Sequence, residues 1–413
     1  MRRVLATFGN GDCGRLGHSL VDHAAEEVPR VVRSLLGGPP LAAVAAGGAH
    51  TVALDADGAV HTWGLNDKGQ LGLGHDREET ELGLPQEVPM PERCVALAAG
   101  YFHTLALGES GAVWAFGCNG KGQLGLGKDV VLAREPRLVK GLQDQKVVAL
   151  AAGMEHSLAL TAGGEVYSWG ASAHGRLGHG APTSLRLFGA GVEFKPRLIR
   201  AFEALRIKQI SAGQMHSAAI SADGDAFMWG YGKFNQLGFG NDEDVQTPAV
   251  LPPLRGNTAA IACGWLHTLA VAHGGAVLSW GANQNGVLGH GHEKDQTPKW
   301  PTRIPCLEAK QVAAGWKHSA AVTTGGRLCT WGWGGSQGTA YSFEKGSGTG
   351  GQLGHGNDFD YWSPHQVEWL QLEETEWTKQ VHEGGETAWR VKQVACGLNH
   401  MAAIIELSPG VQL

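Results

Sequence analysis

Seven histidines recur along the chain at nearly fixed intervals, which raises the question of a metal site. Each follows a glycine and two variable residues, and successive histidines are 53, 53, 60, 51, 51 and 82 residues apart. The seven are His50, His103, His156, His216, His267, His318 and His400. A metal site needs three or four converging ligands, whereas this pattern gives one equivalent residue per repeat. We therefore interpret the histidines as structural residues that hydrogen-bond to the backbone of their own repeat, and we predict no metal site.

The other residues that could do chemistry fall into no catalytic pattern. The sequence contains no Gly-x-Ser-x-Gly, no His-Glu-x-x-His and no Cys-x-x-Cys pair. Gly9-Asn-Gly11-Asp-Cys-Gly14 matches a dinucleotide-binding motif by letter, but a phosphate cradle needs a helix N-terminus behind it. The equivalent glycines elsewhere are followed by Gln-Leu-Gly, not by the Lys-Ser/Thr of a P-loop. We predict no catalytic residue and no cofactor, hence no enzyme.

A second repeated phrase alternates with the histidine phrase. It consists of an aromatic residue, glycine, four variable residues and Gly-Gln-Leu-Gly or a close variant, and it begins at Trp63, Phe116, Trp169, Trp229, Trp280 and Trp331. A seventh copy at Phe8 has no histidine phrase before it, and His400 has no aromatic-Gly phrase after it. The two incomplete repeats complement each other, which indicates a closed ring whose last unit combines both chain ends.

Within each repeat the local signals are those of short β-strands. His50–Leu54 and Ala59–Trp63 are runs with β-formers separated by Asp55-Ala-Asp-Gly58, a hairpin turn. Repeats of about 50 residues with several such strands are typical of propeller blades. The sequence therefore predicts an all-β fold, a seven-bladed β-propeller over residues 1–413 as one domain. Many of its 63 glycines lie in the two repeated phrases and in the hairpin turns between the strands.

Composition narrows the function classes further. The net charge of −6 and the lack of a basic tail predict no direct nucleic-acid binding. The sequence contains no run of 18 apolar residues, so we predict no membrane span. The seven scattered cysteines favour a reducing compartment. We expect an intracellular protein of the cytoplasm or nucleus, or of an organelle if a transit peptide has been removed, and we favour a monomer.

The paired phrases resemble the repeats of the regulator of chromosome condensation family. Ala-Ala-Gly-Tyr-Phe-His-Thr and Trp-Gly-Leu-Asn-Asp-Lys-Gly-Gln-Leu-Gly are examples, and the resemblance covers residues 4–407. It implies seven blades, a last blade shared by the N- and C-terminal strands, and function through the two flat faces. It does not imply one activity, because members of the family include an exchange factor for the small GTPase Ran, a plant ultraviolet-B photoreceptor, and scaffolds.

Trp265 and Trp316 occupy the same place in adjacent repeats, directly before the residue that precedes the histidine. The ultraviolet-B receptors of the family carry Gly-Trp-Arg-His-Thr in three consecutive blades, and their arginines hold a dimer together. Here Leu266 and Lys317 replace arginine, so the resemblance implies an incomplete light-sensing cluster. One alternative is a partner-binding aromatic patch, which Tyr101 and Phe102 would extend if they share that face. The other is ordinary packing at the top of the blades.

Three insertions interrupt the repeats, near residues 184–195, 335–350 and 370–389. The second is rich in glycine and serine and carries Tyr341, Phe343, Glu344 and Lys345, and the third carries Trp377. Long loops on a rigid scaffold are often functional sites, although some are tolerated excursions.

These observations predict a non-enzymatic scaffold that binds a protein partner through one face and the inserted loops. The candidate contacts are Tyr101, Phe102, Trp265, Trp316, Lys317, Tyr341, Phe343, Glu344, Lys345 and Trp377. The alternative is an exchange factor for a Ran-like small GTPase, with the 335–350 loop as a wedge that displaces nucleotide. A second alternative is an ultraviolet-B photoreceptor.

Overall fold

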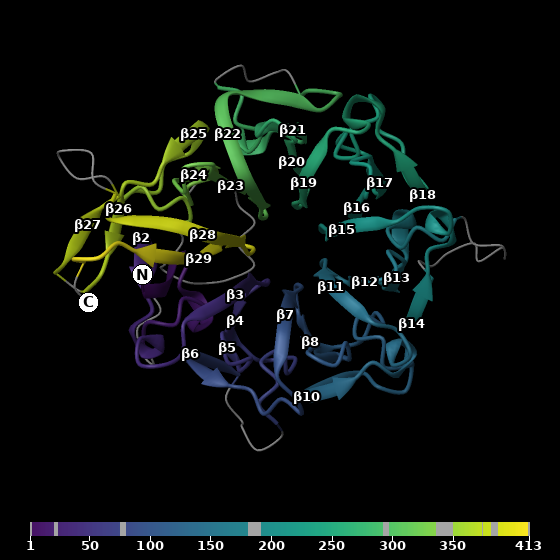
Figure 1. Cartoon of the computed structure of the whole chain (residues 1–413), viewed down its shortest axis with the longest axis horizontal. Helices are drawn as coiled ribbons and strands as arrows, with labels where there is room; N and C mark the ends of the chain where they lie inside the picture. The colour runs from purple at the N-terminus through teal and green to yellow at the C-terminus, as the bar shows by residue number, and fades with distance from the viewer. Residues whose placement is uncertain are drawn as a thin grey trace.

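Seven β-sheet blades are arranged around a central axis (Figure 1). The computed structural model describes residues 2–19, 24–74, 80–180, 191–291, 297–335, 350–373, 375–380 and 387–411. Within blades one to six the four strands pair antiparallel in chain order, the first near the axis and the fourth at the rim. The sequence-based prediction of a seven-bladed, all-β propeller is confirmed.

The strands of blades one to four follow the repeat without interruption. Blade one holds β3 (Leu41–Ala46), β4 (His50–Asp55), β5 (Val60–Leu65) and β6 (Glu81–Glu87). Blade two holds β7 (Cys94–Ala99), β8 (His103–Gly108), β9 (Val113–Cys118) and β10 (Leu132–Leu138). Blade three holds β11 (Val147–Ala152), β12 (His156–Thr161), β13 (Val166–Ala171) and β14 (Val192–Leu198). Blade four holds β15 (Ile207–Ala212), β16 (His216–Ser221), β17 (Ala226–Gly230) and β18 (Val245–Val250).

Blades five and six share one long strand. Blade five holds β19 (Thr258–Cys263), β20 (His267–Ala272) and β21 (Ala276–Gly281), and blade six holds β23 (His318–Thr323), β24 (Leu328–Gly332) and β25 (Tyr361–Gln366). β22 (Thr302–Ala314) pairs with β21 through its first half and with β23 through its second. The register of β22 against β21 shifts between Arg303 and Glu308, and Cys306, with a positive φ of 56°, lies in this bulge.

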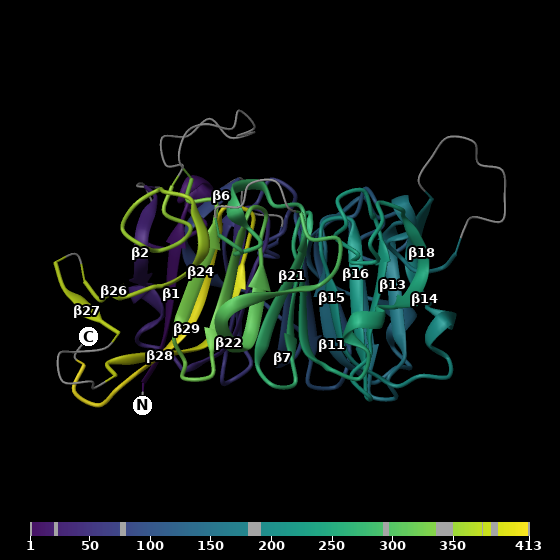
Figure 2. The same cartoon turned by 90° about the horizontal axis from the view of Figure 1, so that it is seen from above.

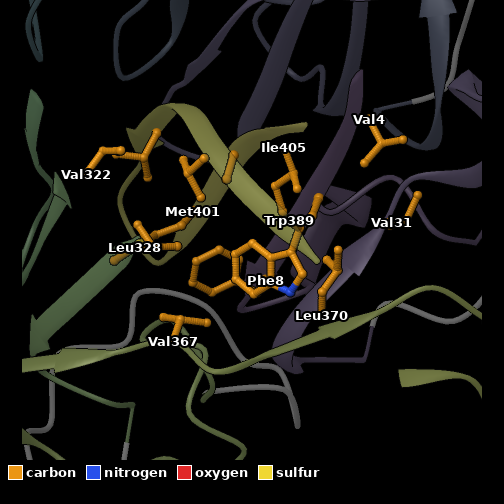
Figure 3. Close-up of a cluster of buried hydrophobic side chains, with 14 of the residues drawn as sticks. Val4, Phe8, Val31, Val322, Leu328, Val367, Leu370, Trp389, Met401 and Ile405 are labelled. Atoms are coloured by element: carbon orange, nitrogen blue, oxygen red, sulfur yellow. The ribbon is translucent and has the colours of Figure 1, made fainter. Parts of the chain in front are cut away.

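Blade seven closes the ring with strands from both chain ends. Its strands are β28 (Trp389–Cys396), β29 (His400–Leu407), β1 (Arg2–Gly9) and β2 (Glu26–Val31). β1 and β29 pair in one continuous register from Arg2 opposite Leu407 to Gly9 opposite His400, which confirms the predicted closure. Figure 3 shows the core of this blade, in which Phe8 and Val31 from the N-terminal segment pack with Trp389, Met401 and Ile405.

A short hairpin extends blade seven at the outer rim. β26 (Trp369–Gln371) pairs in parallel with β2, and β27 (Trp377–Lys379) pairs with β26. These two strands occupy the described part of the 370–389 insertion. Single turns of 3-10 helix lie between strands elsewhere: η1 (Asp12–Gly14), η2 (Arg33–Leu35), η3 (Lys140–Leu142), η4 (Ala173–Gly175), η5 (Arg200–Phe202), η6 (Pro252–Leu254) and η7 (Gln284–Gly286). In the described part of the chain, no helix is both long and apolar enough to cross a membrane.

Strand pairing puts two sets of loops on the same face of the ring. Each histidine begins the second strand of its blade and lies opposite the glycine that follows the aromatic residue of the third strand, as His50 lies opposite Gly64. The loops before the second strand and after the third therefore share one end of every blade. We call this end the histidine face. It is the upper edge in Figure 2, because β1 starts at the N-terminus on the lower edge and its Gly9 end pairs with His400.

Candidate functional site

The repeated histidines form hydrogen bonds between blades, not within them as the sequence predicts. His50 Nε2 lies 2.9 Å from Thr104 Oγ1 in the next blade, and His156 Nε2 lies 2.9 Å from Ser217 Oγ. The equivalent pairs are His103 with Ser157, His216 with Thr268, His267 with Ser319 and His400 with Thr51. The last of these crosses the closure between blade seven and blade one. The hydroxyl residue that usually follows the histidine in the sequence is thus the acceptor for the preceding blade.

The hydroxyl groups also fix which imidazole nitrogen carries the proton. Ser217 Oγ donates to the Arg176 carbonyl at 2.9 Å, and Trp229 Nε1 donates to the same carbonyl at 2.9 Å. Since the hydroxyl proton is used there, the hydroxyl accepts from Nε2–H of His156. A neutral imidazole satisfies this geometry. Burial lowers the pKa of His50, His103, His216 and His267 to about 3, and holds those of His156 and His400 well below the usual value.

His318 is the exception among the seven. The residue after the last histidine is Met401, so blade seven offers His318 no hydroxyl. Neither ring nitrogen of His318 has a hydrogen-bond partner in the described part of the chain. Its ring is also turned: a Cβ on Gly315 would meet Nε2 of His318, whereas a Cβ on Gly153 would meet Nδ1 of His156. Burial lowers the pKa of His318 to about 4, with the backbone of His400 opposing the shift.

The glycine that precedes each histidine by three residues leaves no room for a side chain. A Cβ on Gly100 would contact the His103 ring and would lie 2.6 Å from the Gly153 carbonyl oxygen of the next blade. The same carbonyls accept backbone bonds across the joints, as Gln214 N donates to Gly264 O at 3.2 Å. Glycines and histidines together hold neighbouring blades in contact around the axis.

Three tryptophans gather on the histidine face of blades five and six. The ring centroids of Trp265 and Trp316 are 4.7 Å apart, and those of Trp316 and Trp333 are 5.7 Å apart at 82°. All three side chains are half-buried, unlike the blade-core tryptophans such as Trp331, which is fully buried. Trp265 and Trp316 lie in the loops before the second strands. Trp333 directly follows β24, and its backbone N–H donates to Lys317 O at 2.8 Å.

Lys317 is held against this cluster. Its Nζ lies 4.8 Å from the Trp316 ring centroid and 5.4 Å from that of Trp333, within the range of cation–π attraction. The residue is 8% exposed. Burial lowers the pKa of Lys317, and the nearby Asp360 carboxylate opposes the shift. Trp265, Trp316, Trp333 and Lys317 are called the tryptophan cluster below.

This repeat geometry is shared with known proteins. The family model described as RCC1-like domain matches residues 4–403. The chain belongs to the RCC1-like domain family. The ultraviolet-B receptor UVR8 of Arabidopsis thaliana is 33% identical over 390 residues, which are 93% of this chain and 78% of that protein. The regulator of chromosome condensation of Xenopus laevis is 31% identical over 386 residues, 90% of this chain and 85% of that protein.

A solved RCC1-like structure agrees with the whole ring. The crystal structure of Prp20p from Saccharomyces cerevisiae, reported with its binding properties to Gsp1p and histones, superposes with a TM-score of 0.80 at 26% identity. The match covers 99% of this chain and 93% of that one. The resemblance inferred from the paired phrases is therefore confirmed.

The RCC1-like ring separates the other predicted site residues. Tyr101 and Phe102 do lie on the histidine face, where their rings pack edge to face with centroids 4.4 Å apart. They belong to blade two, across the axis from blades five and six (Figure 1). Trp377 is 48% exposed on the rim hairpin of blade seven, away from the tryptophan cluster. Tyr341, Phe343, Glu344 and Lys345 lie outside the described residues.

Two of the three insertions lie between strands whose ends are on the histidine face. The 184–195 segment leads into β14, and the 335–350 segment lies between β24 and β25, so the strands that flank both have their ends on the histidine face. Of these segments, residues 184–190 and 336–349 lie outside the described residues. The 370–389 segment follows a fourth strand and forms the rim hairpin instead.

Sequence reasoning missed Trp333 and a second set of histidines. Trp333 does not occupy the repeat position of Trp265 and Trp316, although the phrase Trp331-Gly-Trp333 was a visible signal. The second set follows Leu-Gly at the end of the aromatic-Gly phrase and bonds to a hydroxyl on the third strand. His18 pairs with Thr7, His179 with Ser168, His290 with Ser279 and His355 with Thr330. Among the described residues, no group of three or more His, Cys, Asp and Glu side chains is arranged to hold a metal ion.

Proposed function

We propose that this RCC1-like propeller is a non-enzymatic scaffold that binds a partner protein on its histidine face, at the tryptophan cluster. The observation that carries the proposal is the packing of Trp265, Trp316 and Trp333 across two blades outside the blade cores. Blade-core tryptophans are fully buried, and four of them donate their Nε1–H to a carbonyl, as Trp280 does to Gln236 O. Half-buried aromatic rings that gather on a rigid surface are the usual anchors of protein interfaces. An intracellular setting belongs to the same proposal.

The experiment is site-directed photo-crosslinking. A benzophenone amino acid replaces Trp265 in one variant and Trp377 in a second, and both are irradiated in extract of the source organism. We expect one discrete adduct from position 265, which disappears when Trp333→Ala is added, and no such adduct from position 377. An adduct from position 377 alone would move the docking surface to the rim hairpin.

An exchange factor for a Ran-like small GTPase is the second candidate. It is supported by the similarity to the regulator of chromosome condensation across 90% of the chain and by the Gsp1p binding named for Prp20p. Release of labelled GDP from a panel of small GTPases, with and without this protein, tests it. Unchanged release from every GTPase in the panel would remove this candidate and leave the scaffold.

Ultraviolet-B sensing is the third candidate, and Trp333 is the observation that favours it. The sequence comparison left two tryptophans and no arginine, whereas the cluster has a third indole ring and a lysine over two of them. Size-exclusion chromatography before and after ultraviolet-B exposure tests it. An elution volume that does not change on irradiation would dispose of light sensing.

A further inference from the structure

The face opposite the histidine face carries basic side chains around the axis. We call it the turn face, because the hairpin turns between second and third strands lie on it, and it is the lower edge in Figure 2. The first strand of every blade starts on this face and runs beside the axis (Figure 1). Each first strand begins at a buried residue, such as Val147 in blade three, with an exposed residue on either side of it. These two exposed positions are equivalent in all seven blades and therefore form a ring around the axis.

The ring is far more basic than the chain that forms it. Its bases are Arg93, Lys146, Arg206, Lys208, Lys310, Arg390 and Lys392. Its one acid is Glu308, which pairs with Arg303 at 4.0 Å. The net charge of the whole chain is −6, so overall composition does not account for this ring. At the other end of the axis, the loops between first and second strands carry one acid, Glu155, and one base, Lys317.

Most of these bases have no counter-ion. Lys392 Nζ lies 2.8 Å from Glu406 Oε2. The side chains of the other six bases form no ion pair within 4 Å and no hydrogen bond among the described residues. Other carboxylates of this face, such as those of Asp57 and Glu109, lie in the hairpin turns, further from the axis than the first strands. The positive charge around the axis is therefore not neutralised by the neighbouring acids.

The preceding blade holds the stems of four of these bases. A Cβ on Gly326, in the hairpin turn of blade six, would lie 3.1 Å from Arg390 Cβ and 3.5 Å from its Cδ. In the same way Arg93 lies against Gly58, Lys146 against Gly111 and Arg206 against Gly164. The basic groups thus extend from fixed points. Charges of one sign around a common centre attract an ion of opposite sign to that centre.

The unpaired bases form two arcs that face each other across the axis. Blades two to four hold the first arc and blades six and seven the second, while blades one and five contribute only neutral residues, Pro40, Ala42, Asn257 and Ala259. A ligand on the axis contacts both arcs at once, so its negative charges must point outward on at least two sides. Phosphate groups fit this requirement, because arginine and lysine form charge-assisted hydrogen bonds with them.

We propose that the turn face binds a compact polyanion with several phosphate groups on the axis, between the two arcs of bases. This site is separate from the proposed scaffold function, because the tryptophan cluster lies on the opposite face. The ligand is held by charge-assisted bonds from several blades, of which Lys208 in blade four and Lys310 in blade six supply one from each arc.

Calorimetric titration of the full-length protein with inositol hexakisphosphate, at physiological ionic strength, tests the proposal. We expect saturable binding of a single ligand. Lys208→Gln combined with Lys310→Gln should weaken binding roughly tenfold or more, because each arc loses one charge-assisted bond. Lys121→Gln combined with Lys128→Gln is the matched control, since it removes two exposed lysines from the histidine face and should change the affinity by less than about twofold. Equal weakening in both double variants would reduce the effect to general charge attraction and overturn the site.

Two further ligands identify the chemistry. A single-stranded oligonucleotide that binds more tightly than inositol hexakisphosphate, and needs the same lysines, would overturn the compact ligand in favour of an extended polyanion. Vesicles with phosphatidylinositol bisphosphate separate the two sources of clustered phosphate: lysine-dependent cosedimentation assigns the site to a lipid headgroup, and binding in solution alone assigns it to a free ligand. Binding of neither would overturn the polyanion site. Trp265→Ala should bind inositol hexakisphosphate like the wild type, so failure of this site and failure of the scaffold are told apart.

Discussion

Two joints of the same ring, between blades three and four and between blades six and seven, are built from the same phrase and differ in the residue that faces the histidine from the next blade. At the first, His156 donates to Ser217, which donates on to the Arg176 carbonyl. At the second, Met401 stands where Ser217 would, and among the described residues no hydroxyl accepts from His318. Met401 is fully buried in the core of the closing blade (Figure 3). Blade seven thus lacks a hydroxyl for the histidine of blade six, and the residue at this position, Met401, packs in the core of blade seven instead.

The ring closes although this one link is absent, because the other histidine links and the glycine backbone contacts persist. The joint at Met401 also lies in the 82-residue interval that holds both long insertions. The regular joints share one hydrogen-bond pattern, whereas blades six and seven hold the two insertions of the last interval, and blade six holds Trp316 and Trp333.

The largest expected effect is acid sensitivity, which both joints should share. Each buried neutral histidine has a pKa lowered from 6.5, so below pH 6.5 the unfolded chain takes up a proton that the folded chain does not. Stability is therefore lost as pH falls from 6.5 toward the folded-state pKa, by about 1.4 kcal/mol per pH unit for each histidine. Urea unfolding between pH 7.5 and 5 should give a steep decline over several such residues. His156→Leu and His318→Leu should each reduce that slope by one proton, and an unchanged slope would mean that the histidine is protonated in the folded ring.

The next effect tests whether the backbone contacts are equal at the two joints. An alanine methyl at Gly153 would meet the His156 ring and the Gly213 carbonyl, and one at Gly315 would lie 2.5 Å from His318 Cε1 and 2.8 Å from the Gly397 carbonyl oxygen. Overpacking of this kind costs about 1–3 kcal/mol, so both variants should lose stability by that order. Gly37→Ala is the control, because nothing lies within 4 Å of its Cβ position. Calorimetric unfolding of the three variants measures the loss of stability that each substitution causes. A far smaller loss at Gly315 would extend the weakness of this joint to the backbone.

A smaller effect separates the joints directly. His156→Leu removes a donor from Ser217 and should cost about 1–2 kcal/mol at pH 7.5. His318→Leu removes no bond to a hydroxyl among the described residues, so it should cost less, under about 1 kcal/mol. The midpoints of urea unfolding at pH 7.5 compare the stability of the His156→Leu and His318→Leu variants. Equal costs would show that the histidines contribute through packing and not through their bonds.

The ring could be predicted from the sequence because every blade repeats the same two short phrases. The lone phrases at Phe8 and His400 predicted the pairing of β1 with β29 before any contact was visible. Spacing alone does not say which blade a histidine contacts, so the direction of the His156 bond could not be predicted. A continuous β22 also leaves no mark in a periodic pattern, since its two halves resemble the ends of separate strands.

The tryptophan cluster was only half predictable for a related physical reason. Searching equivalent repeat positions finds Trp265 and Trp316, because both precede the histidine by two residues. Trp333 reaches the same place from the third strand: its N–H donates to Lys317 O, as the equivalent N–H does in the other blades, and its ring packs against Trp316. This backbone register repeats from blade to blade, but the side chain at the position varies, with Leu65, Cys118 and Ala171 in other blades, so a search for one repeated residue type passes over Trp333.

The smallest expected effect would repair the exceptional joint. Met401→Thr places a hydroxyl where the other blades carry one, and His318 can then donate to it. The substitution also removes apolar volume from the core of blade seven, so its net effect on stability combines a loss and a gain. A double-mutant cycle with His318→Leu separates them, since the packing loss occurs in both backgrounds. We expect Met401→Thr to cost about 1 kcal/mol less when His318 is present than when it is leucine. A coupling energy of zero would mean that the turned His318 ring is locked by its surroundings, and that this joint differs from the others in the orientation of the histidine as well as in the missing hydroxyl.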